Sequence, residues 1–419
     1  MNKLLRLAVY LFSFIFARGT LFFAPIALAN LLPTRSYGAM EWAHAAASFA
    51  ASLATLGTAA ALPLIQLNRS AKGTVSGILI HHLILVGICL LAMCASFFWN
   101  AVPAFQLSLV LTSAVTLQAL WSIQLKTAGK GEASLLLDAG LFALLAIVAL
   151  IAKYFEVIDA LQWLMIAASL YVLGLFGMTA KSLTEQLRID KTILYRATLE
   201  LSLPLMLGAL VTIAATTSGR LVIGYLGGAL LTADYAILAR AAALPIVAHQ
   251  IILVAKFRHL YKLPDREMER VMLVIIGCVS CSVIGLWIVS PMMGWMLGPA
   301  FFKAFHSYTL PAILILSQSI LWSAISLNDT VNTRKQTMGK ILPWSILFLL
   351  ASMPLAMYLI RNIGVSLAHF VYVHSVVMLL FYLVQACGMY VAGIRLWRSW
   401  LCASGSFVLL SAIATLIYS

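Results

Sequence analysis

LLPTRSYGAMEWA, residues 31–43, can be laid over ALLTADYAILARA, residues 229–241, at an offset of 198 residues. The positions that meet are Leu31, Thr34, Tyr37, Ala39 and Ala43 in the first segment and Ala229, Thr232, Tyr235, Ile237 and Ala241 in the second. A match at this distance in a chain of 419 residues predicts two related halves. Duplicated halves of this kind are a common plan in membrane transporters, so composition decides how the repeat is to be interpreted.

The composition is that of a membrane protein. Hydrophobic residues make up 63% of the chain and charged residues 10%, whereas soluble domains have roughly 45–50% and about 25%. The mean hydropathy is +1.03. We therefore predict an all-α polytopic membrane protein. The net charge is +14, and in a membrane protein the distribution of charged residues between the two sides matters more than this total. We therefore expect no nucleic-acid partner.

A helix needs about 20 mostly apolar residues to cross a bilayer. Twelve windows of this kind lie between charged residues or Gly, Pro and Asn: 7–31, 39–66, 75–98, 101–125, 133–152, 158–180, 198–226, 230–255, 271–296, 305–330, 341–360 and 364–392. Residues 401–418 form either a thirteenth span or part of a cytoplasmic tail that begins with RLWRSW. The first span follows MNKLLRLAVY without a small-residue cleavage site, so we expect no cleavable signal peptide.

The positive charges of the connections fall mainly on one side. With the N-terminus in the cytoplasm, 20 lysines and arginines face the cytoplasm and 4 face the opposite side, while 3 lie within spans. The four on the opposite side are Arg35, Lys153, Lys303 and Arg361. The positive-inside rule thus predicts a multi-pass protein with a cytoplasmic N-terminus.

Six predicted spans precede the most basic connection and six follow it. We therefore expect an N-terminal six-helix bundle (1–180), a cytoplasmic linker (181–197) and a C-terminal six-helix bundle (198–392). Residues 393–419 are a C-terminal tail or an extra transmembrane segment. Each repeat segment joins the first and second helix of its half. No connection is long enough for an extramembrane catalytic domain, so we expect a non-enzymatic protein whose function lies among the helices.

Four stretches resemble one family. LANLLPTRSYGAMEWAHAAASFAASLATLGTAAALP (28–63) resembles the first hairpin of Wzx-type polysaccharide flippases, and ELSLPLMLGALVTIAATTSGRLVIGYLGGALLTADYAILARAAALPIV (200–247) resembles the start of their second half. WMLGPAFFKAFHSYTLPAILILSQ (295–318) and NDTVNTRKQTMGK (328–340) are similar to the region of the ninth and tenth helices and the loop after it. The wider group is the multidrug/oligosaccharidyl-lipid/polysaccharide (MOP) exporter superfamily.

This resemblance implies two six-helix bundles around a central cavity that work by alternating access. The cargo would be an O-antigen or related repeat unit on undecaprenyl pyrophosphate, moved across the bacterial inner membrane. The implied partners are this lipid-linked oligosaccharide, membrane lipids and other polysaccharide assembly proteins. No cofactor is implied, and a proton or sodium gradient is a candidate energy source.

The sequence places arginines at membrane depth. FSFIFARGTLFF (12–23) carries Arg18 near its middle, and Arg220 and Arg240 lie within two later spans. A centred arginine costs roughly 2.5–3.5 kcal/mol on insertion scales, so such residues usually face the bundle interior. We expect Arg18, Arg220 and Arg240 to line the cavity, because a guanidinium stays charged and matches the geometry of phosphate. The alternative is that each arginine only locks helices through an ion pair or a backbone carbonyl.

Polar residues beside these arginines complete the candidate site. Thr216, Thr217 and Ser218 precede Arg220 and are candidates for contacts with sugars. The family often carries an aspartate just before this arginine, whereas Ser218 and Gly219 stand here.

Candidates for coupling to an ion gradient are Glu41, His44 and His249. The alternatives are a Glu41–Arg35 pair at the outer mouth and neutral histidines bonded to carbonyl groups. We expect no metal site and no catalytic residues, and the C-x-x-C of Cys278 and Cys281 is interpreted as a pair of inert thiols.

Two other functions remain open at this point. A membrane-embedded glycan polymerase or ligase shares the composition but usually needs one long periplasmic loop, whereas all the predicted outer connections are short. A drug/cation antiporter of the same superfamily would favour a buried carboxylate, whereas the charges within these spans are cationic. The sugar unit and the oligomeric state leave no signature in the sequence.

Overall fold

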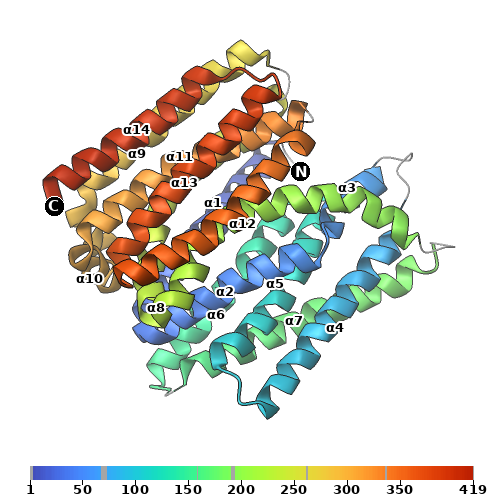
Figure 1. The fold of residues 1–419 in the computed structure, drawn as a ribbon. Coiled ribbons are helices and arrows are strands. Elements are labelled where there is room, and N and C mark those ends of the chain that lie inside the picture. Colours follow the sequence, from blue (N-terminus) through green and yellow to red (C-terminus); the bar gives the residue numbers. More distant parts are fainter. Residues whose placement is uncertain are drawn as a thin grey trace. The chain divides into compact units, whose positions relative to one another are not determined.

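The computed structural model describes residues 3–67, 73–157, 159–189, 194–260, 263–335 and 337–418. Within these ranges, the side chains of residues 3–11, 67, 204, 212, 215, 216, 247–260, 293, 296, 333 and 338 lie outside the described part. All regular structure in the described ranges is helical (Figure 1). The helices are α1 (Lys3–Leu31), α2 (Thr34–Ala54), α3 (Thr58–Leu67), α4 (Val75–Phe98), α5 (Pro103–Thr127), α6 (Gly131–Tyr154), α7 (Ala160–Gln186), α8 (Tyr195–Leu260), α9 (Asp265–Leu297), α10 (Pro299–Ser307), α11 (Thr309–Lys335), α12 (Met338–Ile363), α13 (Leu367–Val391) and α14 (Trp397–Tyr418).

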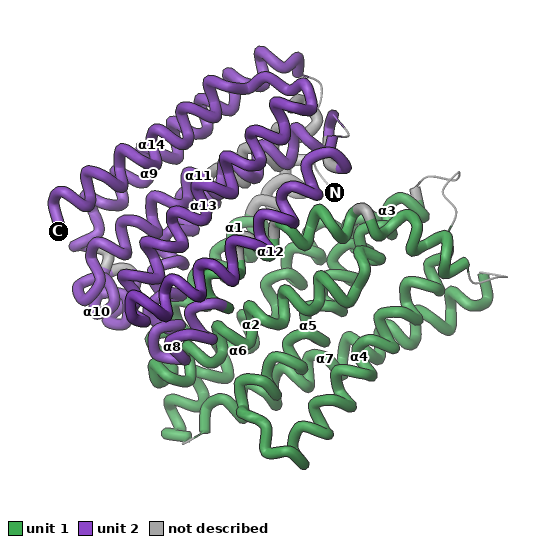
Figure 2. Tube along the Cα trace, viewed as in Figure 1, with its two compact units in different colours: residues 1–221 green, residues 222–419 purple. Residues whose placement is uncertain are grey.

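The chain forms two compact units, Met1–Leu221 and Val222–Ser419, which are coloured separately in Figure 2. The boundary falls within α8, inside the segment that the sequence assigned to the first helix of the C-terminal bundle. The first part of α8 therefore packs with the N-terminal helices, and the bundle boundary predicted at residue 198 differs from the division by contacts. Helical geometry in α8 is interrupted at Gly228 (φ 72°, ψ −169°), between the predicted spans 198–226 and 230–255.

The helices have the dimensions and exterior of membrane spans. Eleven helices in the described ranges are long and apolar enough to cross a bilayer, and the bent pair α2–α3 makes up to twelve. Large apolar side chains point outward, as at Phe98 (87% exposed), Leu91 (72%) and Trp295 (94%). A soluble protein rarely exposes so much contiguous apolar surface, whereas a lipid-facing exterior requires it.

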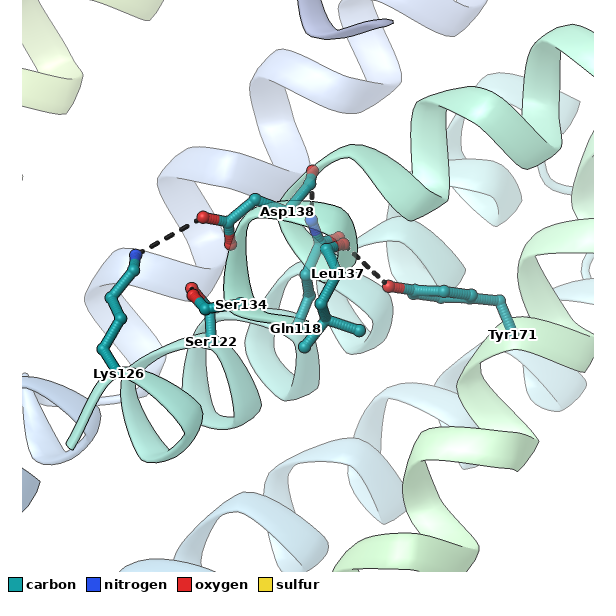
Figure 3. Close-up of polar contacts among 7 residues, drawn as sticks. All are labelled: Gln118, Ser122, Lys126, Ser134, Leu137, Asp138 and Tyr171. Carbon is teal, nitrogen blue, oxygen red and sulfur yellow. Dashed lines mark hydrogen bonds and ion pairs between the residues drawn. The ribbon is translucent and has the colours of Figure 1, made fainter. Parts of the chain in front are cut away.

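In the first unit, α5 is the central helix and packs against α2, α4, α6 and α7. The antiparallel α5–α6 hairpin is joined by polar contacts, and one further contact reaches it from α7 (Figure 3). The contacts are Ser122 Oγ to Ser134 Oγ at 2.9 Å, Gln118 Nε2 to the Asp138 carbonyl oxygen at 2.7 Å, Tyr171 Oη to the Leu137 carbonyl oxygen at 3.4 Å, and Lys126 Nζ to Asp138 Oδ2 at 3.4 Å. Hydrogen bonds between side chains help to hold membrane helices together where the hydrophobic effect gives no preference between lipid and protein.

In the second unit, α11 is the most buried span and contacts α9, α13 and α14. Its polar side chains form a buried network with α13 and α14. The network consists of Asn328 Nδ2 donating to Gln385 Oε1 (3.0 Å), Gln385 Nε2 donating to Asp329 Oδ1 (2.7 Å) and Trp400 Nε1 donating to Asn328 Oδ1 (3.4 Å). Because the side-chain amides of Asn328 and Gln385 bond to each other and to their neighbours, these polar groups are buried with hydrogen-bond partners.

Residues 401–418, for which the sequence allowed either a cytoplasmic tail or a further span, belong to the helix α14. Its first turn is capped from α9, because Glu269 Oε1 accepts a hydrogen bond from the backbone N–H of Arg398 at 2.9 Å. Its other end is held by Tyr418, whose hydroxyl accepts from Trp287 Nε1 at 3.4 Å. The helix has 22 residues and is apolar enough to cross a membrane. A thirteenth span is therefore the alternative that we retain as a prediction.

The span predicted at 39–66 is bent by 50° between α2 and α3. Leu56 (φ 50°) and Gly57 (φ 70°) both adopt left-handed backbone conformations at the bend. α8 passes directly over Gly57: a Cβ atom there would lie 2.8 Å from the backbone nitrogen of Met206 and closer still to the carbonyl oxygen of Ser202. Glycine at 57 thus serves both the turn and the close approach of α8.

Gly57→Ala is therefore expected to destabilise the protein by about 3 kcal/mol, because it combines left-handed strain with a clash against the α8 backbone. Gly129→Ala is a matched control: Gly129 has φ 75° but nothing within 4 Å of an added Cβ. The control should cost only about 1 kcal/mol. Thermal unfolding in one detergent at one scan rate measures both variants, and equal shifts in apparent Tm would contradict the close packing of α8 on the bend.

Candidate functional site

The centre of the candidate site is an ion pair between α2 and α8. Arg220 Nη1 donates to Glu41 Oε2 at 2.8 Å, and both residues belong to the first unit. The Glu41 side chain is fully buried and that of Arg220 is 16% exposed. The pair is therefore shielded from solvent, where breaking it by removal of one partner is costly.

Tyr37 holds the other oxygen of the same carboxylate. Its hydroxyl donates to Glu41 Oε1 at 3.1 Å, and the tyrosine is only 1% exposed. Tyr37 and Glu41 stand four residues apart on α2, so their side chains lie on one face of the helix. The rest of α2 is rich in alanine, and small side chains permit close packing of neighbouring helices. Each oxygen of Glu41 thus has its own donor, one from α2 and one from α8.

Glu41 has a different partner from the one considered from the sequence. Arg35 lies in the first turn of α2 and is exposed, whereas the carboxylate six residues later is buried against Arg220. The aspartate that the family often carries before this arginine is absent, and a glutamate from another helix supplies the negative charge. The alternative in which an arginine locks helices through an ion pair thus applies to Arg220 in this conformation.

Arg220 keeps donors beyond this pair. A guanidinium has five N–H groups in a planar fork. Among the described residues, Arg220 makes one side-chain hydrogen bond, from Nη1 to Glu41. The guanidinium therefore retains N–H groups that can donate to an incoming anion.

The residues predicted to accompany Arg220 differ in how they are held. Thr217 and Ser218 are buried, at 5% and 6% exposure. The Thr217 hydroxyl donates to the carbonyl oxygen of Ile213 at 2.7 Å, within its own helix. Its oxygen can then act toward a ligand only as an acceptor. The side chain of Thr216 lies outside the described residues.

Arg18 is the second arginine of the first unit at this depth. It is partly buried on α1, and its guanidinium carbon lies 5.8 Å from the ring centroid of Phe14, one turn earlier. Within the described ranges, no ion pair involves Arg18. An aromatic face stabilises a cation by roughly 0.5–2 kcal/mol, which is less than a buried carboxylate provides. A positive charge without a matching carboxylate therefore remains on α1.

The third arginine is in the other unit. Arg240 lies in the second part of α8, is partly buried, and has further interactions of its own. The structure thus brings Glu41 and Arg220 together, and it places Arg18 with them in the first unit and Arg240 in the second.

Of the two histidines predicted to take part in coupling, only His44 has a described side chain. His44 is partly buried on α2, and its ring centroid lies 4.9 Å from that of Phe142 on α6. It stands three residues after Glu41, on the same side of the helix. The side chain of His249 lies outside the described residues. Within the described part of the chain, no group of three or more His, Cys, Asp or Glu side chains is placed to hold a metal ion.

Sequence reasoning missed the role of Tyr37 and the network around Asn328. Tyr37 was noticed only as a repeat position, although a tyrosine four residues before a membrane-depth glutamate is a usable signal. The amides of Asn328 and Gln385 are far apart in the sequence, and only the packing of α11 on α13 shows that they pair.

Comparison with known proteins gives a likeness of fold. No family model matches the sequence, and no curated protein matches it. One similar solved structure is described as the lipid II flippase MurJ in an inward closed conformation, with a TM-score of 0.64, 13% identity and coverage of 97% of this chain and 93% of that one. Another is an inward-facing multidrug resistance MATE family transporter of the MOP superfamily, with a TM-score of 0.55, 15% identity and coverage of 91% and 94%.

These likenesses extend over nearly the whole chain. The predicted fold class is confirmed at this level: the described chain is all-helical, has 11 to 12 candidate membrane spans, and has a fold similar to those of these two proteins.

Breaking the central pair tests its energetic role. Arg220→Met leaves a buried, uncompensated carboxylate, so we expect a loss of about 3–5 kcal/mol. Glu41→Gln should cost less, because Arg220 retains some access to solvent. The double variant should recover part of the loss, since no buried charge is left unpaired.

Unfolding of the four proteins in the same detergent measures this cycle. The Arg196–Glu200 pair is a matched control on the same helix, because its side chains are 94% and 67% exposed. Neutralising that pair should leave stability unchanged within error. Strictly additive effects of Glu41→Gln and Arg220→Met would show that the central pair does not couple α2 to α8.

Proposed function

We propose that this protein is a flippase for an anionic, lipid-linked oligosaccharide. The cargo is an undecaprenyl-pyrophosphate-linked O-antigen or related repeat unit, moved across the bacterial inner membrane by alternating access. The observation that carries the proposal is the positive charge that Arg18 and Arg220 place on the apolar helices of the first unit. Arg18 has no carboxylate partner within the described ranges, and Arg220 has donors beyond its bond to Glu41.

The chemistry of the cargo fits this positive charge. A pyrophosphate group carries about two negative charges that the hydrocarbon layer cannot solvate, and unpaired ions there are very costly. Guanidinium groups stay charged at any physiological pH and offer two parallel N–H bonds to phosphate oxygens. Arginines facing a hydrated cavity therefore lower the barrier for the head group while the lipid tail stays in the bilayer.

Arg18, Arg220 and Arg240 are assigned to the head group. Thr216, Thr217 and Ser218 are assigned to the sugars. Because the Thr217 hydroxyl donates to Ile213, it acts as an acceptor for a sugar O–H. The support for a lipid-linked cargo from outside this chain is the likeness to the structure described as a lipid II flippase.

Energy for transport is assigned to a proton or sodium gradient. Glu41, His44 and His249 are the candidate coupling residues, and no cofactor is needed. The N-terminus lies in the cytoplasm, the two six-helix bundles move against each other around the central cavity, and other polysaccharide assembly proteins supply and take the cargo.

A drug/cation antiporter is the second candidate, and one observation favours it. Glu41 is a fully buried carboxylate, the kind of group that binds protons or cations, and the chain also resembles a MATE transporter. The same carboxylate is already neutralised by Arg220, which favours an anionic cargo over a cationic one. The glycan polymerase or ligase is the weaker alternative, because the fold is that of transporters.

Flipping of a lipid-linked oligosaccharide in proteoliposomes tests the proposal. The wild-type protein should expose the oligosaccharide on the opposite leaflet, and Arg18→Ala should slow this about tenfold or more, since it removes a charge-assisted contact with the head group. Arg196→Ala, at an exposed site on α8, is the matched control and should flip at the wild-type rate. Normal flipping by both Arg18→Ala and Arg220→Ala would exclude a role of these arginines in transport.

A further inference from the structure

We propose that Glu41 is a built-in substitute for the cargo phosphate: it holds Arg220 while the protein is empty and is displaced from it by an incoming anion. The inference rests on the proposed function and adds a reason why the carrier opens only when loaded. It is carried by the contacts between α2–α4 and the first part of α8, all within the first unit.

These contacts form a seam along α8. Glu41 and Arg220 lie at one end, and the bend at Gly57 lies beneath Ser202 and Met206. Toward the start of α8, the Thr198 hydroxyl accepts a hydrogen bond from the backbone N–H of Thr74 at 3.2 Å. At the far end, the Tyr195 hydroxyl lies 2.7 Å from His81 Nδ1, and His81 Nε2 lies 3.0 Å from the Ala54 carbonyl oxygen. The seam therefore runs from the first residue of α8 to Arg220.

Among the described residues of this seam, the Glu41–Arg220 pair is the ionic contact. The other contacts are neutral hydrogen bonds and backbone packing, which net only about 0.5–1.5 kcal/mol each. Parting the helices would separate the Glu41 carboxylate, which is fully buried in the packed state, from its counter-charge, and this costs more than one neutral hydrogen bond. The pair thus sets the main barrier to opening in the described part of the seam.

An incoming anion lowers this barrier. A phosphate oxygen offers Arg220 the same type of charge-assisted bond that the carboxylate provides, and a pyrophosphate offers several such oxygens. A neutral sugar cannot compensate the guanidinium. When Arg220 moves to the cargo, Glu41 keeps the hydrogen bond from Tyr37, which fixes the carboxylate in place to recapture Arg220 after release.

The tyrosine–glutamate arrangement of Tyr37 and Glu41 is not repeated at the matching positions of the second half. The repeat pairs Tyr37 with Tyr235, and Tyr235 is likewise buried, at 3% exposure. The Tyr235 ring packs against Phe370 at a centroid distance of 5.3 Å and against His374 at 6.2 Å. The position that corresponds to Glu41 is Ala239. The second half thus has the tyrosine of this pair, and an alanine stands where the first half has the glutamate.

Glu41→Gln separates this role from a structural one. Without the competing carboxylate, inorganic pyrophosphate should bind the detergent-solubilised protein about tenfold more tightly, an effect within the range typical of coupled sites. In proteoliposomes, the half-saturating concentration of lipid-linked oligosaccharide and the maximal flipping rate should both fall, because cargo binds better and leaves more slowly. A merely structural loss would lower the maximal rate alone.

Two further variants keep the test decisive. Glu41→Asp retains the charge and should restore wild-type pyrophosphate affinity to within a factor of about three. Tyr37→Phe should tighten pyrophosphate binding in the same direction as Glu41→Gln but less, and it replaces Glu41→Gln as the deciding variant if the latter fails to fold. Glu200→Gln, from the exposed pair on α8, is the matched control and should leave both readouts unchanged.

The outcomes distinguish the two proposals. If wild-type protein flips the oligosaccharide but Glu41→Gln and Tyr37→Phe bind pyrophosphate with wild-type affinity, the substitution role of Glu41 is wrong and the flippase assignment stands. If wild-type protein neither flips the oligosaccharide nor binds pyrophosphate, the flippase assignment itself fails.

Discussion

Hydrocarbon does not solvate charge, and this constraint decides where each polar group of the protein lies. The buried amides of α11 pair with α13 and α14, and the polar side chains of α5 pair with α6. The same constraint draws Glu41 and Arg220 together across two helices. Arg18 differs: among the described side chains, its contact is the Phe14 ring, whose centroid lies 5.8 Å from the guanidinium carbon. A membrane protein keeps such an arrangement where a ligand supplies the missing charge.

The constraint also explains what the sequence was able to predict. Hydropathy and the distribution of Lys and Arg identify the spans because each helix must satisfy its backbone internally and bury few charges. The predicted window 75–98 coincides with α4, and most of the others overlap a single helix with ends that differ by up to about six residues. The windows 198–226 and 230–255 both fall within α8, where only Gly228 interrupts the helical geometry. The C-terminal segment was ambiguous because only its contacts with Glu269 and Trp287 show that it packs as a helix of the second unit.

The site was predictable in its residue types and less so in its pairing. Arg18, Arg220 and Glu41 stand out because charges are rare within apolar segments. Their partners depend on the packing of α8 against α2, which no local pattern encodes. Residues 198–221 were assigned to the second half by the repeat, whereas contacts place them with the first unit. This segment, continuous through α8 with the second unit, is the natural place for an interaction that changes between conformations.

The central claim is that the carrier selects cargo by negative charge. The most direct test is a comparison of flipping rates in proteoliposomes for three lipids that share one oligosaccharide and one polyprenyl chain but carry a pyrophosphate, a single phosphate or a neutral linker. The account predicts the fastest flipping for the pyrophosphate, slower flipping for the monophosphate, and none above protein-free liposomes for the neutral lipid. Equal rates for the neutral and the pyrophosphate lipid would contradict it.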